Sequence, residues 1–242
     1  MAGTIAALSG VLAVAAALTM PRLREHLGAQ GGRSVWRGIA EVLKDPNHLR
    51  AFAFSALMMA TGFTVIPFFT IYLEANVGLS EAQIPLVYLF GGIATLFTAR
   101  RIGRLSDRLS KARVFRYLVV GGAVPILAAT WMPPMPIPAV LGVSTLLFVF
   151  LSGRMIPGMA LITGAANPAL RGTFMAFNAA VQSAAMGLAS IAGGLIIGRN
   201  AAGQLEFYGL AGLVGVAMSL LSLWVLRGLA VHGSEGVIRV KG

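Results

Sequence analysis

Apolar residues along this chain occur in long continuous runs, separated by short segments that carry the charges, prolines and turn residues. A helix needs about 20 such residues to cross a bilayer, whereas a transmembrane β-strand would show about ten residues of alternating polarity. The pattern therefore predicts an all-α polytopic membrane protein with seven transmembrane helices. The predicted spans are Thr4–Met20, Ala51–Leu73, Glu81–Ala99, Tyr117–Met132, Ile137–Ala166, Thr173–Ile197 and Phe207–Leu226.

The composition supports a membrane protein and excludes several kinds of chemistry. Hydrophobic residues make up 57% of the 242 positions and charged residues only 11%, against about 25% charged in a soluble domain. The chain has no cysteine, so disulfide scaffolds, cysteine-ligated metals and thiol catalysis are all excluded.

The basic residues predict the orientation. All 19 lysines and arginines except Arg154 and Arg199 fall in connections or ends on one side of the predicted topology. Loops rich in lysine and arginine stay in the cytoplasm, so we expect the plasma membrane (the inner membrane of a bacterium), with the N-terminus outside and the C-terminus cytoplasmic. A nucleic-acid surface would need interleaved aromatic residues or a folded basic domain. The sequence shows neither, and we expect no nucleic-acid partner.

Four segments follow from this topology. Residues 1–20 form a single transmembrane helix rather than a signal peptide, because they lack a basic start and a small-residue cleavage site. Residues 21–50 form a cytoplasmic linker in which Ser34 precedes an amphipathic helix on the membrane face; the alternative is a disordered basic loop. Residues 51–229 form a six-helix unit, and residues 230–242 a cytoplasmic tail.

Enzyme chemistry is not expected within the membrane. The eight carboxylates and three histidines lie in connections or at the mouths of spans, so no proton relay or metal site can be assembled there. We therefore expect a protein that is not an enzyme, with no cofactor and no metal.

Arg154 is the one charge placed well inside a predicted span. Such a residue almost always faces a cavity or a partner. The alternative is that it snorkels to the interface, but about 12 residues separate it from the helix end, or ~18 Å, beyond the reach of an arginine. Arg154 is therefore the leading candidate for a substrate cavity.

Other polar and helix-breaking residues accompany it. Asn178 and Gln182 form an i, i+4 pair on one helix face. The pair could bind a polar ligand or could join neighbouring helices by hydrogen bonds, and the sequence favours neither alternative. Thr64 and Tyr72 supply polar groups to the second span. Kinks are expected at Pro67 and Pro157, a capping box at Ser80 and Gln83, and close helix contact at the GxxxG pair Gly194 and Gly198.

The segment from Gly103 to Arg113 (GRLSDRLSKAR) resembles the signature loop of the major facilitator superfamily. As a short connection between helices, it would turn at Gly103, place Asp107 at a helix N-terminus, and be held inside by the basic Arg108 and Lys111. Ser110 and Ala112 depart from the family pattern, which usually has a glycine and a basic residue there.

Further stretches are similar to the sugar-efflux and drug:proton antiporter branch of that family. They are Pro67–Leu73 with Val77–Ser80, Gly91-Gly92, Gly153–Pro157 and Asn167–Met175. The resemblance implies a partial major facilitator fold, the C-terminal half of a transporter (spans six to twelve of twelve), with the second and fifth predicted spans lining a midplane cavity. It also implies that the first, fourth and seventh spans face lipid.

The expected function is efflux of a small solute, a drug or a sugar, by alternating access and coupled to protons. The expected partners are the substrate, the lipid bilayer, and a missing N-terminal half or a second copy. The alternative is a truncated or non-transporting membrane subunit that requires a separate N-terminal half.

Overall fold

Transmembrane helices dominate the residues that the computed structural model describes, 35–233 and 236–239. The helices are α2 (Val35–Lys44), α3 (Pro46–Phe63), α4 (Ile66–Tyr72), α5 (Ile84–Leu109), α6 (Lys111–Thr130), α7 (Ile137–Gly153), α8 (Met155–Ala165), α9 (Arg171–Ile196) and α10 (Tyr208–Leu226), with a π-turn at Leu73–Val77 and a 3-10 turn at Pro168–Leu170. Strands β1 (Gly198–Arg199) and β2 (Leu205–Glu206) form one antiparallel hairpin, and β3 (Ala230–Gly233) and β4 (Gly236–Arg239) form another.

Five stretches of the described chain are long and apolar enough to cross a membrane, which confirms the predicted all-α polytopic class. They are Pro46–Val77, Lys111–Thr130, Ile137–Ala165, Pro168–Ile196 and Tyr208–Leu226. Helix α5 is not among them, because Arg100 and Arg101 follow its apolar part directly. The predicted span Thr4–Met20 lies outside the described residues.

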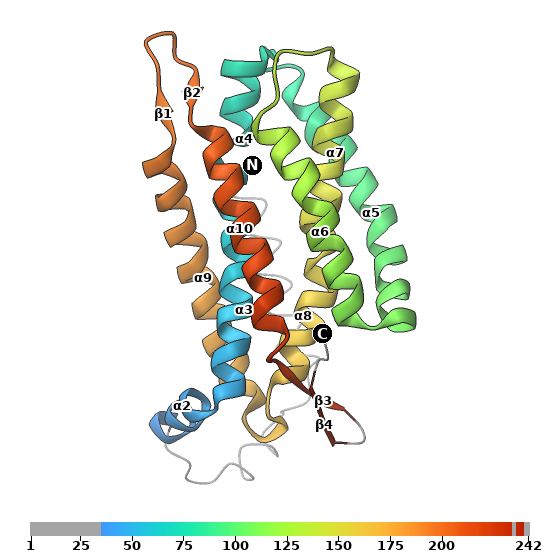
Figure 1. The fold of residues 1–242 in the computed structure, drawn as a ribbon, viewed down its shortest axis with the longest axis vertical. Coiled ribbons are helices and arrows are strands. Elements are labelled where there is room, and N and C mark those ends of the chain that lie inside the picture. The colour runs from blue at the N-terminus through green and yellow to red at the C-terminus, as the bar shows by residue number, and fades with distance from the viewer. Residues whose placement is uncertain (1–34, 234–235, 240–242) are drawn as a thin grey trace, which may run out of the picture. The chain divides into compact units, whose positions relative to one another are not determined.

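From residue 39 onward the helices form one bundle of two groups (Figure 1). Helices α3, α9 and α10 pack together, as do α5, α6 and α7, and the groups meet where α10 contacts α6 and α3 contacts α8. In chain order the bundle is a repeat of three spans, α3/α4–α5–α6 and then α7/α8–α9–α10. The first span of each repeat therefore packs against the second and third spans of the other.

The first span of each repeat is broken next to a proline. Helix α3 ends at Phe63 and α4 begins at Ile66, just before Pro67, while α7 ends at Gly153 and α8 begins at Met155, two residues before Pro157. A proline has no amide hydrogen for the carbonyl four residues earlier, so the helix is interrupted there. The two breaks lie beside Pro67 and Pro157, where kinks were expected, and Thr64 and Arg154 each stand three residues before the proline of their break.

The segment that resembles the signature loop is helical, contrary to the expected turn at Gly103. Helix α5 continues through Gly103 to Leu109, and the chain reverses at Ser110, which has a positive φ of 123°. The Ser110 hydroxyl accepts a hydrogen bond from the Arg113 amide at 3.3 Å and so caps α6. The helix extends because arginine and leucine, which fill this segment, are strong helix formers. Asp107, Arg108 and Lys111 are exposed at this end, and within the described residues Asp107 caps no helix N-terminus.

The expected helix contact through Gly194 and Gly198 is also corrected. Helix α9 ends at Ile196, and Gly198 lies in strand β1. The close approach is made by Gly193, where a Cβ would lie 2.8 Å from the Thr64 carbonyl oxygen. A Cβ on Gly194 would meet the Phe68 ring at an ordinary 3.5 Å.

Two helix starts differ from the sequence prediction. Helix α3 begins at Pro46, inside the predicted linker, because Asp45 caps it by accepting a hydrogen bond from the Asn47 amide at 2.8 Å. Helix α5 begins at Ile84 rather than Glu81, since only half of the capping box forms: the Ser80 amide donates to the Gln83 side chain at 3.0 Å.

Two asparagines hold the hairpins onto the bundle. The Asn47 side chain donates to the carbonyls of Ala165 and Ala230 at 3.1 and 2.9 Å and accepts from the Ala230 amide at 2.8 Å. Asn76 does the same for the other hairpin, donating to the Leu205 carbonyl and accepting from its amide, both at 2.9 Å. Each amide group thus pairs with a strand end as a neighbouring strand would. The sequence prediction of a plain tail at 230–242 missed this arrangement.

We expect Asn47→Ala to loosen hairpin β3–β4, because three hydrogen bonds are lost, at a cost of about 2 kcal/mol. Amide hydrogen exchange at Ala230 should become faster, while exchange at Leu205 should not change. Asn76→Ala is the reciprocal control and should act only on Leu205. If Asn47→Ala accelerated amide exchange equally at Ala230 and Leu205, the effect would not be local, and Asn47 would not hold hairpin β3–β4 specifically.

Candidate functional site

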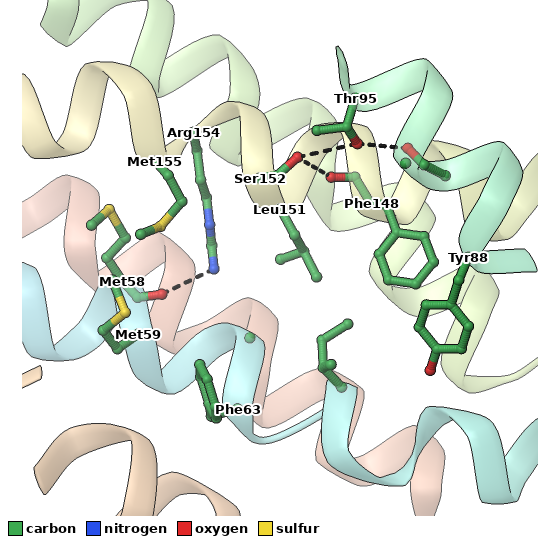
Figure 2. Close-up of a pocket in the computed structure, with 14 residues that line it drawn as sticks. Met58, Met59, Phe63, Tyr88, Thr95, Phe148, Leu151, Ser152, Arg154 and Met155 are labelled. Atoms are coloured by element: carbon green, nitrogen blue, oxygen red, sulfur yellow. Dashed lines mark hydrogen bonds between the residues drawn. The ribbon is translucent and has the colours of Figure 1, made fainter. Parts of the chain in front are cut away.

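Arg154 occupies the break between α7 and α8 and is almost fully buried, with 3% of its surface exposed. Its Nη1 donates to the Ser219 hydroxyl on α10 at 2.8 Å, and its Nη2 donates to the Met58 carbonyl on α3 at 3.0 Å. Figure 2 shows the guanidinium pointing from the break toward the Met58 carbonyl. Arg154 therefore lies where the two groups of helices meet, and it does not snorkel to the interface.

The charge of Arg154 is not balanced by a carboxylate. The one salt bridge found in the described residues joins His48 and Asp45. The Nε of Arg154 has no hydrogen-bond partner there either. Burying an arginine is costly unless its charge and its donors are satisfied, so this site has capacity for one more acceptor or anion.

A cavity of about 480 Å³ opens beside Arg154. Its walls come from α3, α4, α5, α7 and α8, and they are mostly methionine, aromatic and glycine residues (Figure 2). The lining residues are Met58, Met59, Gly62, Phe63, Ile66, Tyr88, Gly91, Gly92, Thr95, Phe148, Leu151, Ser152, Arg154 and Met155. A volume of this size suits a small organic molecule.

The hydroxyl groups of the cavity are already engaged. Thr95 donates to the Gly91 carbonyl at 2.7 Å and Ser152 to the Phe148 carbonyl at 2.6 Å, each within its own helix. The Tyr88 hydroxyl is 2.5 Å from the Thr70 hydroxyl. A ligand would therefore find largely apolar walls, one cationic group, and hydroxyl oxygens that can still accept a hydrogen bond.

Tyr72 and Thr64, both predicted for the cavity, lie outside it. The Tyr72 hydroxyl donates to the Met132 carbonyl at 2.9 Å, and its ring centroid is 4.5 Å from that of Tyr208. The Thr64 hydroxyl donates to the Ala60 carbonyl at 2.7 Å, within one helical turn. Both side chains are buried in helix contacts.

Asn178 and Gln182 on α9 also lie outside the cavity. Gln182 donates to the Ser55 hydroxyl on α3 at 2.9 Å. This hydrogen bond joins α9 to α3, as the second of the two alternatives for Gln182 expected. Asn178 is 1% exposed, and its Oδ1 has no hydrogen-bond partner in the described residues. Of the five predicted cavity residues, only Arg154 lines the cavity.

Sequence reasoning missed the methionine and aromatic walls. Met58, Met59, Phe63 and Met155 read in sequence as ordinary membrane-span residues, because lipid and an apolar cavity favour the same side chains. The one available signal was the clustering of methionines around the two breaks, and methionine is common at adaptable binding surfaces.

The described residues thus form a helical membrane bundle, with a buried arginine at a helix break and an apolar cavity beside it. Residues 51–236 match the sequence profile of the Major Facilitator Superfamily. The chain belongs to this family, whose members move small solutes across membranes. No curated protein matches the chain at a significant level.

Proposed function

We propose that the chain is the C-terminal half of an efflux transporter that moves a drug-like amphipathic solute by alternating access, coupled to protons. The observation that carries the proposal is Arg154, a buried cation without a carboxylate partner, on the wall of an apolar cavity. A solute with an apolar body and an anionic or acceptor group would satisfy both features.

A sugar fits this cavity less well than an amphipathic solute. Sugars present many hydroxyl groups, and each one left unpaired on burial costs free energy. Thr95, Ser152 and Tyr88 already have hydrogen-bond partners. Arg154 and these three hydroxyl oxygens are few groups for the many hydroxyls of a sugar, so between the two substrate types we favour the drug type.

A second bundle of helices would complete the cavity. Large apolar side chains of α5 and α9 are widely exposed, with Leu96 at 73% and Leu195 at 84%. The family resemblance pointed to α6 and α10 as lipid-facing, yet α9 is the least covered span: 11% of its apolar window is buried, against 44% for α6. We propose that an N-terminal half, or else a second copy of this chain, packs on α5 and α9.

Proton coupling would need a group from that second bundle. The cavity residues of this chain include no aspartate or glutamate, and a coupling carboxylate must reach the solute path. Alternating access would then consist of one bundle rocking against the other around Arg154.

We also propose that the end carrying the α5–α6 turn and the starts of α3 and α9 is cytoplasmic. The exposed residues Arg101, Arg104, Arg108, Lys111 and Arg171 gather there, and such loops stay inside. This orientation would put the C-terminus in the cytoplasm, and with the span predicted from sequence at Thr4–Met20 the N-terminus would lie outside.

A transport assay tests the proposed substrate class. Cells that express the chain in its native setting are loaded with a lipophilic carboxylate, a lipophilic cation or a neutral sugar, with and without an imposed pH gradient. We expect export of the carboxylate, faster with the gradient. Preferred export of the sugar would contradict the proposal. No export of any solute, together with cross-linking to a separate membrane protein, would favour the alternative of a non-transporting subunit.

A further inference from the structure

A second hollow lies at the end of the bundle where α3 begins and α10 ends, away from Arg154. It has a volume of about 590 Å³. Its lining residues are Leu49, Arg50, Ala53, Trp224, Val225, Arg227 and Gly228. We refer to it as the Arg50–Arg227 groove. Among the described residues that line it, both charged ones are arginines and none is an aspartate or glutamate.

Arg50 is fixed across the end of α10. Its Nη1 donates to the carbonyl of Gly228 at 3.1 Å, two residues beyond the end of α10 at Leu226. The side chain lies close over Gly228, where a Cβ would stand 3.4 Å from Nε. This contact uses one of the five N–H donors of Arg50 and sets the direction of the others.

The remaining donors of the groove have no protein partner in the described part of the chain. No hydrogen bond other than that to Gly228 is recorded for the Arg50 side chain, and none for that of Arg227. The salt bridge between His48 and Asp45 involves neither residue. Two arginines with unused donors therefore line the same hollow, and arginine is well suited to binding a phosphate.

The rest of the groove is apolar and accessible from the side of the bundle. Trp224 is 69% exposed and Leu49 is 48% exposed. Tryptophan is enriched where a span meets the headgroup layer. The groove thus combines a cationic end with an apolar wall at the end of the spans, the side that we propose to be cytoplasmic, where anionic lipids are concentrated.

We propose that the Arg50–Arg227 groove binds the headgroup phosphate of an anionic glycerophospholipid, with its acyl chains lying along Trp224 and Ala53. The two arginines hold the phosphate oxygens, and the apolar wall replaces contacts with neighbouring lipids. A free phosphate would use the arginines alone and leave Trp224 and Leu49 uncovered, so the shape of the site favours the lipid. The site is independent of the Arg154 cavity and of any transported solute.

Fluorescence quenching of Trp224 in the full chain tests the proposal. Trp36 and Trp131 are replaced by phenylalanine, and the protein is placed in bilayers that contain brominated phosphatidylglycerol or brominated phosphatidylcholine. We expect phosphatidylglycerol to quench Trp224 at a mole fraction at least about fivefold lower, since each arginine near an anionic lipid contributes a factor of about five. Equal quenching by the two lipids would overturn the proposal.

Variants that remove the same number of charges distinguish binding in the Arg50–Arg227 groove from a general attraction of anionic lipids to the basic end of the bundle. Arg50→Gln with Arg227→Gln should remove the preference, whereas Arg101→Gln with Arg171→Gln, exposed arginines at the same end, should keep it. Equal loss in both pairs would overturn the proposal. Arg227→Gln alone, which breaks no hydrogen bond recorded in the described chain, should lower the preference severalfold if the double variant does not fold.

Inorganic phosphate distinguishes the two sources of the same chemistry. At 10 mM it should leave the preference for phosphatidylglycerol unchanged, because the lipid also contacts the apolar wall. If inorganic phosphate abolishes the preference, the groove is a site for free phosphate and the assignment to a lipid is wrong.

Discussion

Replacement of Arg154 by methionine should strongly weaken export of an anionic amphipathic solute while the bundle still folds. Methionine fills similar space in an apolar cavity, and it removes a buried charge that no carboxylate of the described residues balances. Loss of a charged hydrogen bond to the solute costs about 1.5–3 kcal/mol, or roughly 10- to 150-fold in affinity. The measurement is the concentration dependence of export, with the thermal unfolding temperature as the test of folding.

Two further variants make this result specific. Arg154→Lys keeps the charge but cannot reach the Ser219 hydroxyl and the Met58 carbonyl together, so we expect partial export. Arg101→Ala, an exposed arginine outside the cavity, is the control and should export normally. Full export by a folded Arg154→Met protein would remove the main support for the proposed function.

The sequence was sufficient for the all-α membrane class and for the positions of the two helix breaks. Long apolar runs and interior prolines act locally, so the prediction of kinks at Pro67 and Pro157 needed no knowledge of neighbouring helices. The buried position of Arg154 was also predictable, because a charged side chain far from both ends of a span almost always faces the interior of the bundle or a cavity rather than lipid.

The partners of the polar residues were not predictable in the same way. Tyr72, Thr64 and Gln182 are polar residues in spans, as Arg154 is, but each pairs with a backbone carbonyl or a neighbouring hydroxyl rather than facing the cavity. The partner of each polar side chain depends on how the two three-span repeats pack against each other. That packing joins residues far apart in the sequence, so local sequence patterns do not predict it. The turn at Ser110 was missed for a local reason, since glycine was favoured over serine for a positive φ.

Gly193→Ala should strongly destabilise the bundle, although it adds only one methyl group. The new Cβ would lie 2.8 Å from the Thr64 carbonyl oxygen and 2.9 Å from the Phe68 ring. Because the nearest atom belongs to the backbone at the break between α3 and α4, it cannot rotate away, and α9 must move. Overpacking of this kind costs about 1–3 kcal/mol, and we expect a clear fall in the thermal unfolding temperature.

Gly187→Ala in the same helix is the matched control for this prediction. No atom lies within 4 Å of a Cβ at Gly187, so the substitution should be neutral or stabilising by up to about 1 kcal/mol, because alanine favours the helix. The two variants have the same composition, and they differ only in whether α9 meets the broken span at that position. Equal unfolding temperatures for the two would show that α9 does not approach Thr64 as closely as the structure places it, whereas opposite shifts would mean that the packing of α9 fixes the α3–α4 break.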